Sequence, residues 1–189
     1  MDRRIKYTKN TIKETFLNLL EEKDINKITV SEICKIADIN RATFYRYYLD
    51  VYDLLDKIEE EFLEELKHVP FLTNDEYSLS SLAKELLEIF LENKKLVTIL
   101  FKKNTDIYIL NDILEGIHNK YKNKWLNDFP NIDENEIADA NIFAFNGALG
   151  IVNYWIQQGF TESVDEISKK IEEFSYYGVK NYIYKNKEQ

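Results

Sequence analysis

The segment INRATFYRYY, residues 39–48, concentrates the side chains of this chain that are best suited to contacting phosphates and base edges. Arginine guanidinium groups can form paired hydrogen bonds with guanine or phosphate, and hydroxyl groups can donate to phosphate. Phe44 and Tyr48 are four residues apart, so on a helix they would point inward together. The other side chains would then form an outward face suited to duplex DNA. That face comprises Arg41, Ala42, Thr43, Tyr45, Arg46 and Tyr47.

Each of these residues, taken singly, has a simpler interpretation. The tyrosines could be half-buried packing residues, and the arginines could belong to a solvated helix face. Features of the flanking sequence, taken together, favour DNA recognition instead. These features are a helix cap, a tight turn, small side chains where two helices would cross, and a local excess of positive charge.

Residues suited to catalysis are not grouped in this way. The sequence has no glycine-rich phosphate loop and no serine nucleophile elbow, and its two histidines, His68 and His118, are far apart. The single cysteine, Cys34, can form neither an internal disulfide nor a cysteine-rich zinc site. We therefore expect no enzyme activity, no metal and no cofactor. With no signal-peptide pattern and no long apolar run, we expect a cytoplasmic protein that does not enter a membrane.

Two helices joined by a sharp turn would position the 39–48 segment. Thr29 and Glu32 have the spacing of a capping box, which predicts a helix that begins at Thr29. The helical pattern breaks at Asp38, a residue type that tolerates the left-handed backbone conformation better than most. Asn40 is the predicted cap of the next helix. Residues 29–48 are therefore predicted to form a helix-turn-helix.

Apolar residues recur at spacings of three and four along most of the chain, which has only five glycines and two prolines in 189 residues. This pattern predicts an all-α fold of about nine helices. The fourth helix should be capped by Asp50 and should bury Tyr52, Leu55, Ile58 and Phe62. The helices are expected at residues 8–22, 29–37, 40–48, 50–66, 79–93, 95–103, 106–128, 135–158 and 164–184.

A break in the helical pattern around Pro70 divides the chain. Residues 1–50 form the predicted helix-turn-helix domain, which has three helices. The fourth helix, at 51–67, connects this domain to a larger helical bundle at residues 68–189. The first fifty residues carry ten basic and eight acidic side chains, whereas the remainder has a net charge of −11. A mildly basic end on an acidic body indicates that an anion would bind at that end only.

The run ITVSEICKIADINRATFYRYYLDVYDLL resembles the amino-terminal domain of TetR/AcrR family transcriptional regulators, in which a helix-turn-helix is followed by T-F-Y and a capped fourth helix. The resemblance covers residues 6–66. It implies a homodimer that inserts residues 40–47 of each subunit into a major groove of double-stranded operator DNA. The DNA-binding residues implied are Thr29 and Ser31 at phosphates, Asn40 at the cap, Arg41, Ala42 and Thr43 at bases, Tyr45 and Tyr47 at phosphates, and Arg46 at either.

Two positions depart from the family pattern. Asp38 replaces a usual glycine, and Val51 stands where many members carry a lysine that contacts phosphate. DNA affinity would then depend more on Arg46 and on a basic arm formed by Arg3, Arg4, Lys6 and Lys9. Val51 and the acidic body also support an alternative function, a coactivator or adaptor of the same fold that has no ligand and acts through protein contacts.

The larger domain resembles the carboxy-terminal region of a subset of this family through FLENKKLVTILFKKN and FAFNGALGIVNYWIQQGF. The resemblance implies a dimer interface of four helices, two from each subunit. Internal packing is the alternative interpretation of the same small-residue stripe. The expected interface residues are Ala140, Ala144, Gly147, Ile151, Ile167, Ile171 and Phe174.

Aromatic residues are concentrated in the larger domain, where twenty of the 26 lie after residue 50. They could line a pocket for a small-molecule effector, although aromatic residues more often form the core. The candidates are Phe101, Tyr108, Tyr121, Trp125 and Tyr154. The resemblance thus implies a dimeric regulator, expected to be a repressor, that an unknown small molecule controls.

Overall fold

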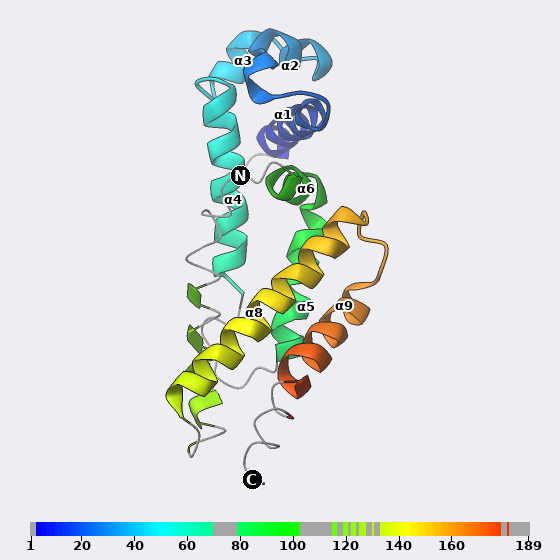
Figure 1. Cartoon of the computed structure of the whole chain (residues 1–189). Helices are drawn as coiled ribbons and strands as arrows, with labels where there is room; N and C mark the ends of the chain where they lie inside the picture. The colour runs from blue at the N-terminus through cyan, green and yellow to red at the C-terminus, as the bar shows by residue number, and fades with distance from the viewer. Residues whose placement is uncertain are drawn as a thin grey trace.

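A computed structural model describes residues 3–69, 79–102, 115–116, 119–120, 122–123, 125–127, 130, 133–178 and 181 (Figure 1). Within these ranges every regular element is a helix, as the sequence predicts. The elements are α1 (Arg3–Glu22), the 3-10 turn η1 (Ile25–Lys27), α2 (Val30–Ile36), α3 (Arg41–Tyr45), α4 (Val51–Lys67), α5 (Leu79–Glu92), α6 (Lys94–Lys102), α8 (Glu134–Gln157), α9 (Val164–Glu172) and the π-helix η3 (Glu173–Tyr177).

The helices are arranged in two groups that α4 and α6 connect. In Figure 1, α1, α2 and α3 lie together at the top, α4 runs down one side, and α5, α8 and α9 form the lower group. α6 lies directly beneath α1. There the Lys95 ammonium contacts Glu14 and Asn18 of α1, both at 2.7 Å. The two groups are therefore in direct contact through polar side chains as well as through α4.

α1 begins five residues earlier than the sequence predicts, at Arg3. The prediction took Thr8 as the start, but its hydroxyl donates to the carbonyl of Arg4 at 2.9 Å. Thr11 donates in the same way to Tyr7 at 3.0 Å. These bonds to the preceding turn show both threonines inside the helix, so the residues of the predicted basic arm are part of α1.

α4 is capped as predicted but buries a different stripe. The Asp50 carboxylate accepts hydrogen bonds from the amides of Tyr52 at 2.8 Å and Asp53 at 2.9 Å. This cap makes Val51 the first helical residue and directs it into the core, so Tyr52 is 52% exposed. The prediction for Tyr52 was therefore wrong, and Leu55 is half-buried rather than buried. The buried stripe of α4 is Val51, Leu54, Ile58, Phe62 and Leu66.

The buried side chains form a continuous cluster that extends from α1 to α9. Its largest fully buried members include Phe16 of α1, Phe44 of α3, Phe62 of α4 and Trp155 of α8. Each such side chain stabilises the fold by about 1.5–3 kcal/mol, so this cluster joins the helix-turn-helix to the rest of the described chain. The boundary predicted at Pro70 lies outside the described residues. A smaller cluster near the start of α8 contains Trp125, Ile137, Ala140 and Ala144.

The carboxy-terminal helices follow the predicted positions within a residue or two, except at the last one. α8 is capped by Asp133, and α9 begins with a reciprocal capping box between Ser163 and Glu166. The predicted helix at 164–184 instead changes at Glu173 into a wider π-turn. The helix predicted at 106–128 lies largely outside the described residues.

Across the part of the chain that the structure covers, no helix combines the length and the apolar character needed to cross a membrane.

Candidate nucleic-acid interface

The start of α2 is fixed by Thr29, whose hydroxyl accepts a hydrogen bond from the Glu32 amide at 3.2 Å. The predicted return contact from Glu32 to the cap is replaced by an ion pair. Both Glu32 carboxylate oxygens bind the Lys23 ammonium, at 2.6 and 2.7 Å. This ion pair connects α2 to the residue that follows the end of α1. Thr29 and Ser31 are exposed at this helix start, where the sequence predicts phosphate contacts.

The turn between α2 and α3 has the left-handed residue that the sequence predicts, because Asp38 has a φ of 51°. The Ile39 amide donates to the Cys34 carbonyl at 3.0 Å and closes the turn. Asn40 then caps α3, since its side-chain oxygen accepts from the Thr43 amide at 2.7 Å and from the Thr43 hydroxyl at 2.9 Å. Helix, tight turn and capped helix are therefore confirmed over residues 29–45.

α3 ends at Tyr45, three residues before its predicted end. The amides of Tyr47 and Tyr48 still donate to the Phe44 carbonyl, at 2.9 and 3.1 Å, but the chain then becomes extended at the cap of α4. Phe44 and Tyr48 point inward as predicted, with exposed fractions of 0% and 5% and ring centroids 5.5 Å apart. Burial raises the pKa of Tyr48 to about 12, so this hydroxyl stays neutral at physiological pH.

The opposite side of α3 faces solvent. Arg41, Ala42, Tyr45 and Arg46 are exposed, and the side chains of Thr43 and Tyr47 are half-buried. The Arg41 guanidinium donates to the Tyr45 hydroxyl at 3.1 Å and lies 5.7 Å from the centre of its ring. This contact raises the pKa of Arg41. The two side chains are therefore assembled as a pair that can meet a groove together.

Tyr47 lies between two lysines from different helices. The Lys9 ammonium of α1 is 5.9 Å from the Tyr47 ring centre. The Lys57 ammonium of α4 donates to the Tyr47 carbonyl at 3.0 Å. These contacts leave Tyr47 half-buried beside the exposed face of α3. The predicted phosphate contact would therefore come from a tyrosine that neighbouring helices already orient.

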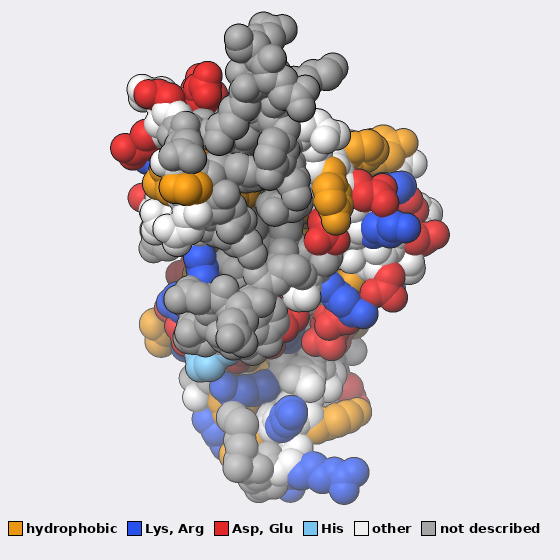
Figure 2. Space-filling view, turned by 90° about the horizontal axis from the view of Figure 1, so that it is seen from below, with side chains coloured by type: hydrophobic (Ala, Val, Ile, Leu, Met, Phe, Trp, Pro, Cys, Tyr) orange, Lys and Arg blue, Asp and Glu red, His pale blue; other side chains and the backbone are white. Residues whose placement is uncertain are grey.

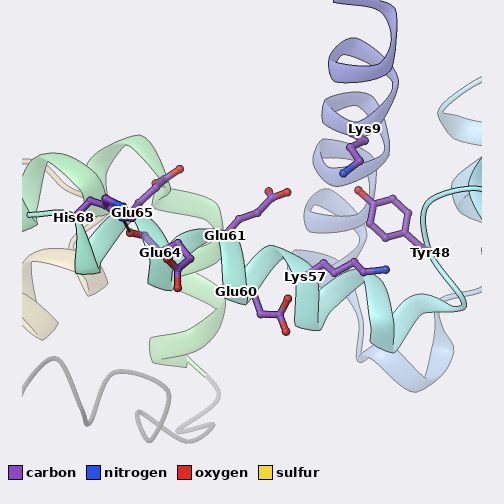
Figure 3. Close-up of a pocket in the computed structure, with 8 residues that line it drawn as sticks. All are labelled: Lys9, Tyr48, Lys57, Glu60, Glu61, Glu64, Glu65 and His68. Carbon is purple, nitrogen blue, oxygen red and sulfur yellow. Dashed lines mark hydrogen bonds between the residues drawn. The ribbon is translucent and has the colours of Figure 1, made fainter. Parts of the chain in front are cut away.

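A surface groove of about 650 Å³ runs from this cluster along α4. Figure 3 shows the Tyr48 hydroxyl directed toward Lys9 of α1, with Lys57 on the adjoining turn of α4. Beyond Lys57 the lining becomes acidic. Carboxylates there would repel a phosphate backbone, which would limit DNA contact to the α2–α3 end. The remaining lining residues are Glu60, Glu61, Glu64, Glu65 and His68.

Charged side chains are mixed at the opposite end of the molecule. Figure 2, which views the molecule from the end away from α2 and α3, shows groups of Asp and Glu side chains beside Lys and Arg side chains on the described surface of that end. By contrast, the exposed charged side chains of α3 and its carboxy-terminal cap are both cationic, Arg41 and Arg46. This helix end therefore presents positive charge to an anionic polymer.

Sequence reasoning missed two exposed residues next to α3. Leu49 is 77% exposed and Tyr52 is 52% exposed. Val51, which aligns with the family's lysine, is 7% exposed and belongs to the core. The position of the Asp50 cap is the signal that could have shown Tyr52 to be the outward residue of this turn.

The structure places the predicted effector residues in different surroundings. Phe101 is half-buried against the main cluster, with its ring 6.2 Å from Phe90. Trp125 is buried in the smaller cluster, and Tyr154 is 61% exposed on α8. These three are not brought together. Tyr108 and Tyr121 lie outside the described residues.

The predicted interface residues divide into internal and exposed sets. Ala140, Ala144, Ile167 and Ile171 are buried within one chain, and Ile151 packs partly against the main cluster. Internal packing therefore accounts for these five. Gly147 is exposed and Phe174 is 65% exposed.

An exposed apolar stripe runs along α8, displaced from the predicted one, and the adjoining η3 adds two exposed aromatic side chains. Phe143 is 72% exposed and Tyr154 is 61% exposed, and the two lie on one helical face with Gly147 and Gly150. A Cβ atom added at either glycine would meet nothing within 4 Å. We term this surface the α8–η3 face. It consists of Phe143, Gly147, Gly150, Tyr154, Phe174 and Tyr177.

The π-turn explains why Phe174 belongs to this face. Ile167 and Ile171 point inward, and a regular helix would keep Phe174 near the same side. In η3 the Ser175 hydroxyl instead donates to the Ala144 carbonyl of α8 at 3.3 Å, and Ser175 is buried. The wider turn thus places Ser175 against α8 and Phe174 outside.

Comparison with known proteins agrees with this architecture. Residues 78–177, slightly more than half of the chain, match the TetR family model described as a transcriptional regulator C-terminal region. The chain is 29% identical over 126 residues to the HTH-type transcriptional regulator YxbF of Bacillus subtilis strain 168. That match covers 64% of this chain and 33% of the relative, so the chain spans about a third of the relative's length.

Solved structures share the fold. A transcriptional regulator from Aquifex aeolicus VF5 superposes with a TM-score of 0.61 at 21% identity, covering 88% of this chain and 96% of that one. The dihydroxyacetone kinase operon activator DhaS gives a TM-score of 0.59 at 22% identity, covering 92% and 96%. The described helices, the helix-turn-helix and the matched carboxy-terminal region therefore agree: the chain belongs to the TetR/AcrR family, whose members are transcriptional regulators rather than enzymes.

Proposed function

We propose that this chain is a homodimeric, sequence-specific DNA-binding repressor, located in the cytoplasm with its operator and controlled by a small-molecule effector. The geometry of α3 carries the proposal. This helix is capped by Asn40, anchored from inside by Phe44 and Tyr48, and exposes Arg41, Ala42, Tyr45 and Arg46. Few groups other than the edges and phosphates of a duplex would use such a face.

Each exposed side chain has a proposed role at the operator. Arg41 and Ala42 would face bases. Arg41 would enter the groove together with Tyr45, because its guanidinium donates a hydrogen bond to the Tyr45 hydroxyl. Thr43 would present its methyl group to a base, because its hydroxyl donates to the Asn40 side chain. The proposed phosphate contacts are Thr29, Ser31, Tyr45 and Tyr47, and Arg46 would serve either.

The proposed dimer forms through the α8–η3 face. Its exposed aromatic side chains flank two glycines that leave room for a partner helix to approach closely. A two-fold axis through this face would present two copies of α3 to one side of a duplex. Their spacing must match half-sites about 34–36 Å apart, one turn of B-DNA.

The proposed effector would bind within the larger domain and act through α4 and α6. Both helices touch the helix-turn-helix end, α4 by continuing from α3 and α6 through Lys95 and Glu14. A ligand that favours a different arrangement of these helices would change the spacing of the two recognition helices. The unliganded repressor would then occupy the operator and the liganded form would leave it.

Binding to DNA tests the proposal directly. The full chain would be used to select duplexes from a random-sequence library, and gel shifts at several salt concentrations would measure affinity for selected and scrambled duplexes. We expect tight, salt-sensitive binding to the selected sequence only. The alternative of a ligand-free adaptor predicts no selection and no protected DNA, and that result would reject the repressor.

A further inference from the structure

The recognition helix is too short to hold its own orientation. α3 has five residues, and isolated helices of that length are not stable in water. Its amino-terminal end is fixed by Asn40 and its buried face by Phe44. What fixes its carboxy-terminal end, and with it Arg46 and Tyr47, is the segment 46–50 that leads into α4.

Two side chains of α4 hold that segment by its backbone. The Lys57 ammonium donates to the Tyr47 carbonyl at 3.0 Å and to the Asp53 carboxylate at 2.8 Å. The same Asp53 oxygen accepts from the Leu49 amide at 2.8 Å. Lys57 also lies 5.5 Å from the centre of the Tyr48 ring. One lysine and one aspartate therefore bind a carbonyl and an amide on either side of Tyr48.

The charge states of both groups favour these contacts. The hydrogen bond from Lys57 lowers the pKa of Asp53, and the bond from the Leu49 amide lowers it further. Asp53 is therefore ionised at neutral pH and remains an acceptor for both donors. Hydrogen bonds between charged groups are stronger than neutral ones, and a carbonyl held this way has little freedom to rotate.

We propose that Lys57 and Asp53 are positioning residues for operator recognition, which fix the carboxy-terminal end of α3 to α4 without touching DNA. This inference rests on the proposed DNA-binding function. It makes α3 and the first turns of α4 one body, so that a movement of α4 would turn the recognition helix with it. The Lys57 ammonium is already bonded to the Tyr47 carbonyl and to the Asp53 carboxylate. Its side chain also lines the groove beside Glu60 and Glu61, whose carboxylates would repel a phosphate.

Lys57→Met tests the role with duplexes that the wild-type protein has selected. The change keeps an unbranched stem and removes the ammonium, and we expect operator affinity to fall about tenfold. The slope of log K against log salt should stay at the wild-type value, because a positioning residue releases no counterion. A lost phosphate contact would instead lower the slope by about 0.9, which would overturn the proposal. Lys57→Arg should restore much of the affinity.

Asp53→Asn tests the same role, because the proposal and its alternative predict opposite changes in DNA affinity. If Asp53 acts only through its charge near DNA, removal of that charge will tighten binding. If Asp53 holds Lys57 and Leu49 in place, binding will weaken severalfold although a repulsive charge has gone. Weaker binding supports the proposal, and tighter binding overturns it. The effects of Asp53→Asn and Lys57→Met should also be less than additive in the double variant.

Lys67→Met is the matched control, because Lys67 forms an exposed ion pair with Glu64 on the same helix, away from the turn. It should bind as the wild type does. A wild-type chain that selects no duplex overturns the DNA-binding function together with this inference. A wild type that binds while Lys57→Met binds equally well overturns only the positioning role.

Discussion

The recognition end, residues 29–57, and the α8–η3 face are both exposed, but their side chains are held in different ways. At the recognition end short hydrogen bonds fix the backbone, such as Asn40 to the Thr43 amide at 2.7 Å and Asp53 to the Leu49 amide at 2.8 Å. The α8–η3 face presents aromatic side chains, with Phe143 72% exposed, around two open glycines. Directional bonds suit a surface that reads a pattern, the role proposed for the recognition end, whereas apolar area suits self-association, the role proposed for the α8–η3 face. Substitutions should therefore alter DNA choice at one end and association at the other.

Phe44→Ala should have the largest effect, because it removes the apolar support beneath the polar recognition end. Phe44 is fully buried, and truncation of such a side chain costs about 3–5 kcal/mol. We expect a lower urea midpoint and no DNA binding at 25 °C. Tyr45→Phe, at the exposed neighbouring position, should leave the free energy of unfolding within about 0.5 kcal/mol of wild type. An unchanged midpoint for Phe44→Ala would contradict the core assignment.

Gly150→Gln should have the second-largest effect, and it should alter association without altering the recognition end. The larger side chain fills the open notch of the α8–η3 face, so dimer association should weaken about a hundredfold while the helical content is unchanged. Sedimentation equilibrium would measure the association. Gly150→Ala is the graded control, since it adds one methyl group and improves helix propensity. A Gly150→Gln chain that dimerises normally would place the interface elsewhere.

Arg41→Ala and Tyr47→Phe sharpen the roles within the recognition end. Loss of Arg41 should relax the preference at one or two base pairs by about 1–3 kcal/mol, as expected for a base contact. Loss of the Tyr47 hydroxyl should weaken binding to all sequences alike, by a few fold. Competition between the selected duplex and single-base variants distinguishes these outcomes. The reverse pattern would exchange the two roles.

At neutral pH Tyr48→Phe should have the smallest effect of these changes, because its effect on stability appears only at alkaline pH. The folded-state pKa is raised from 10.0 to about 12, so the native state keeps a proton that the unfolded state loses. This contribution is fully present below pH 10 and is lost as pH rises toward 12, by about 3 kcal/mol at most. Urea unfolding between these pH values should therefore fall more steeply for the wild type than for Tyr48→Phe. Equal slopes would show that the hydroxyl titrates normally.

Local signals in the sequence were sufficient to predict most of the recognition end. The caps at Thr29, Asn40 and Asp50 involve partners two or three residues away, and the left-handed Asp38 follows from residue type. The inward pair Phe44 and Tyr48 follows from helical spacing. Such features depend on interactions between residues close together in the sequence, so they can be predicted from residue types and spacing.

Features that depend on distant partners were not predicted. Lys57 binds the Tyr47 carbonyl ten residues away, and Lys23 takes the carboxylate that was expected to cap α2. On α8, spacing alone could not tell which of two adjacent stripes faces inward, because the π-turn of η3 and its Ser175 contact decide the packing. The aromatic candidates for effector binding were separated for the same reason, since tertiary packing sends Trp125 inward and Tyr154 outward.

Hydroxyl-radical footprinting on a selected duplex tests the central claim most directly, because one measurement reports both regions. The account predicts two protected segments centred about 10 base pairs apart, one for each α3 of a dimer. Gly150→Gln should weaken both segments together at low protein concentration, and Arg41→Ala should shift sequence preference while keeping their spacing. A wild-type chain that protects no DNA, or that protects one segment only at every concentration, would contradict the account.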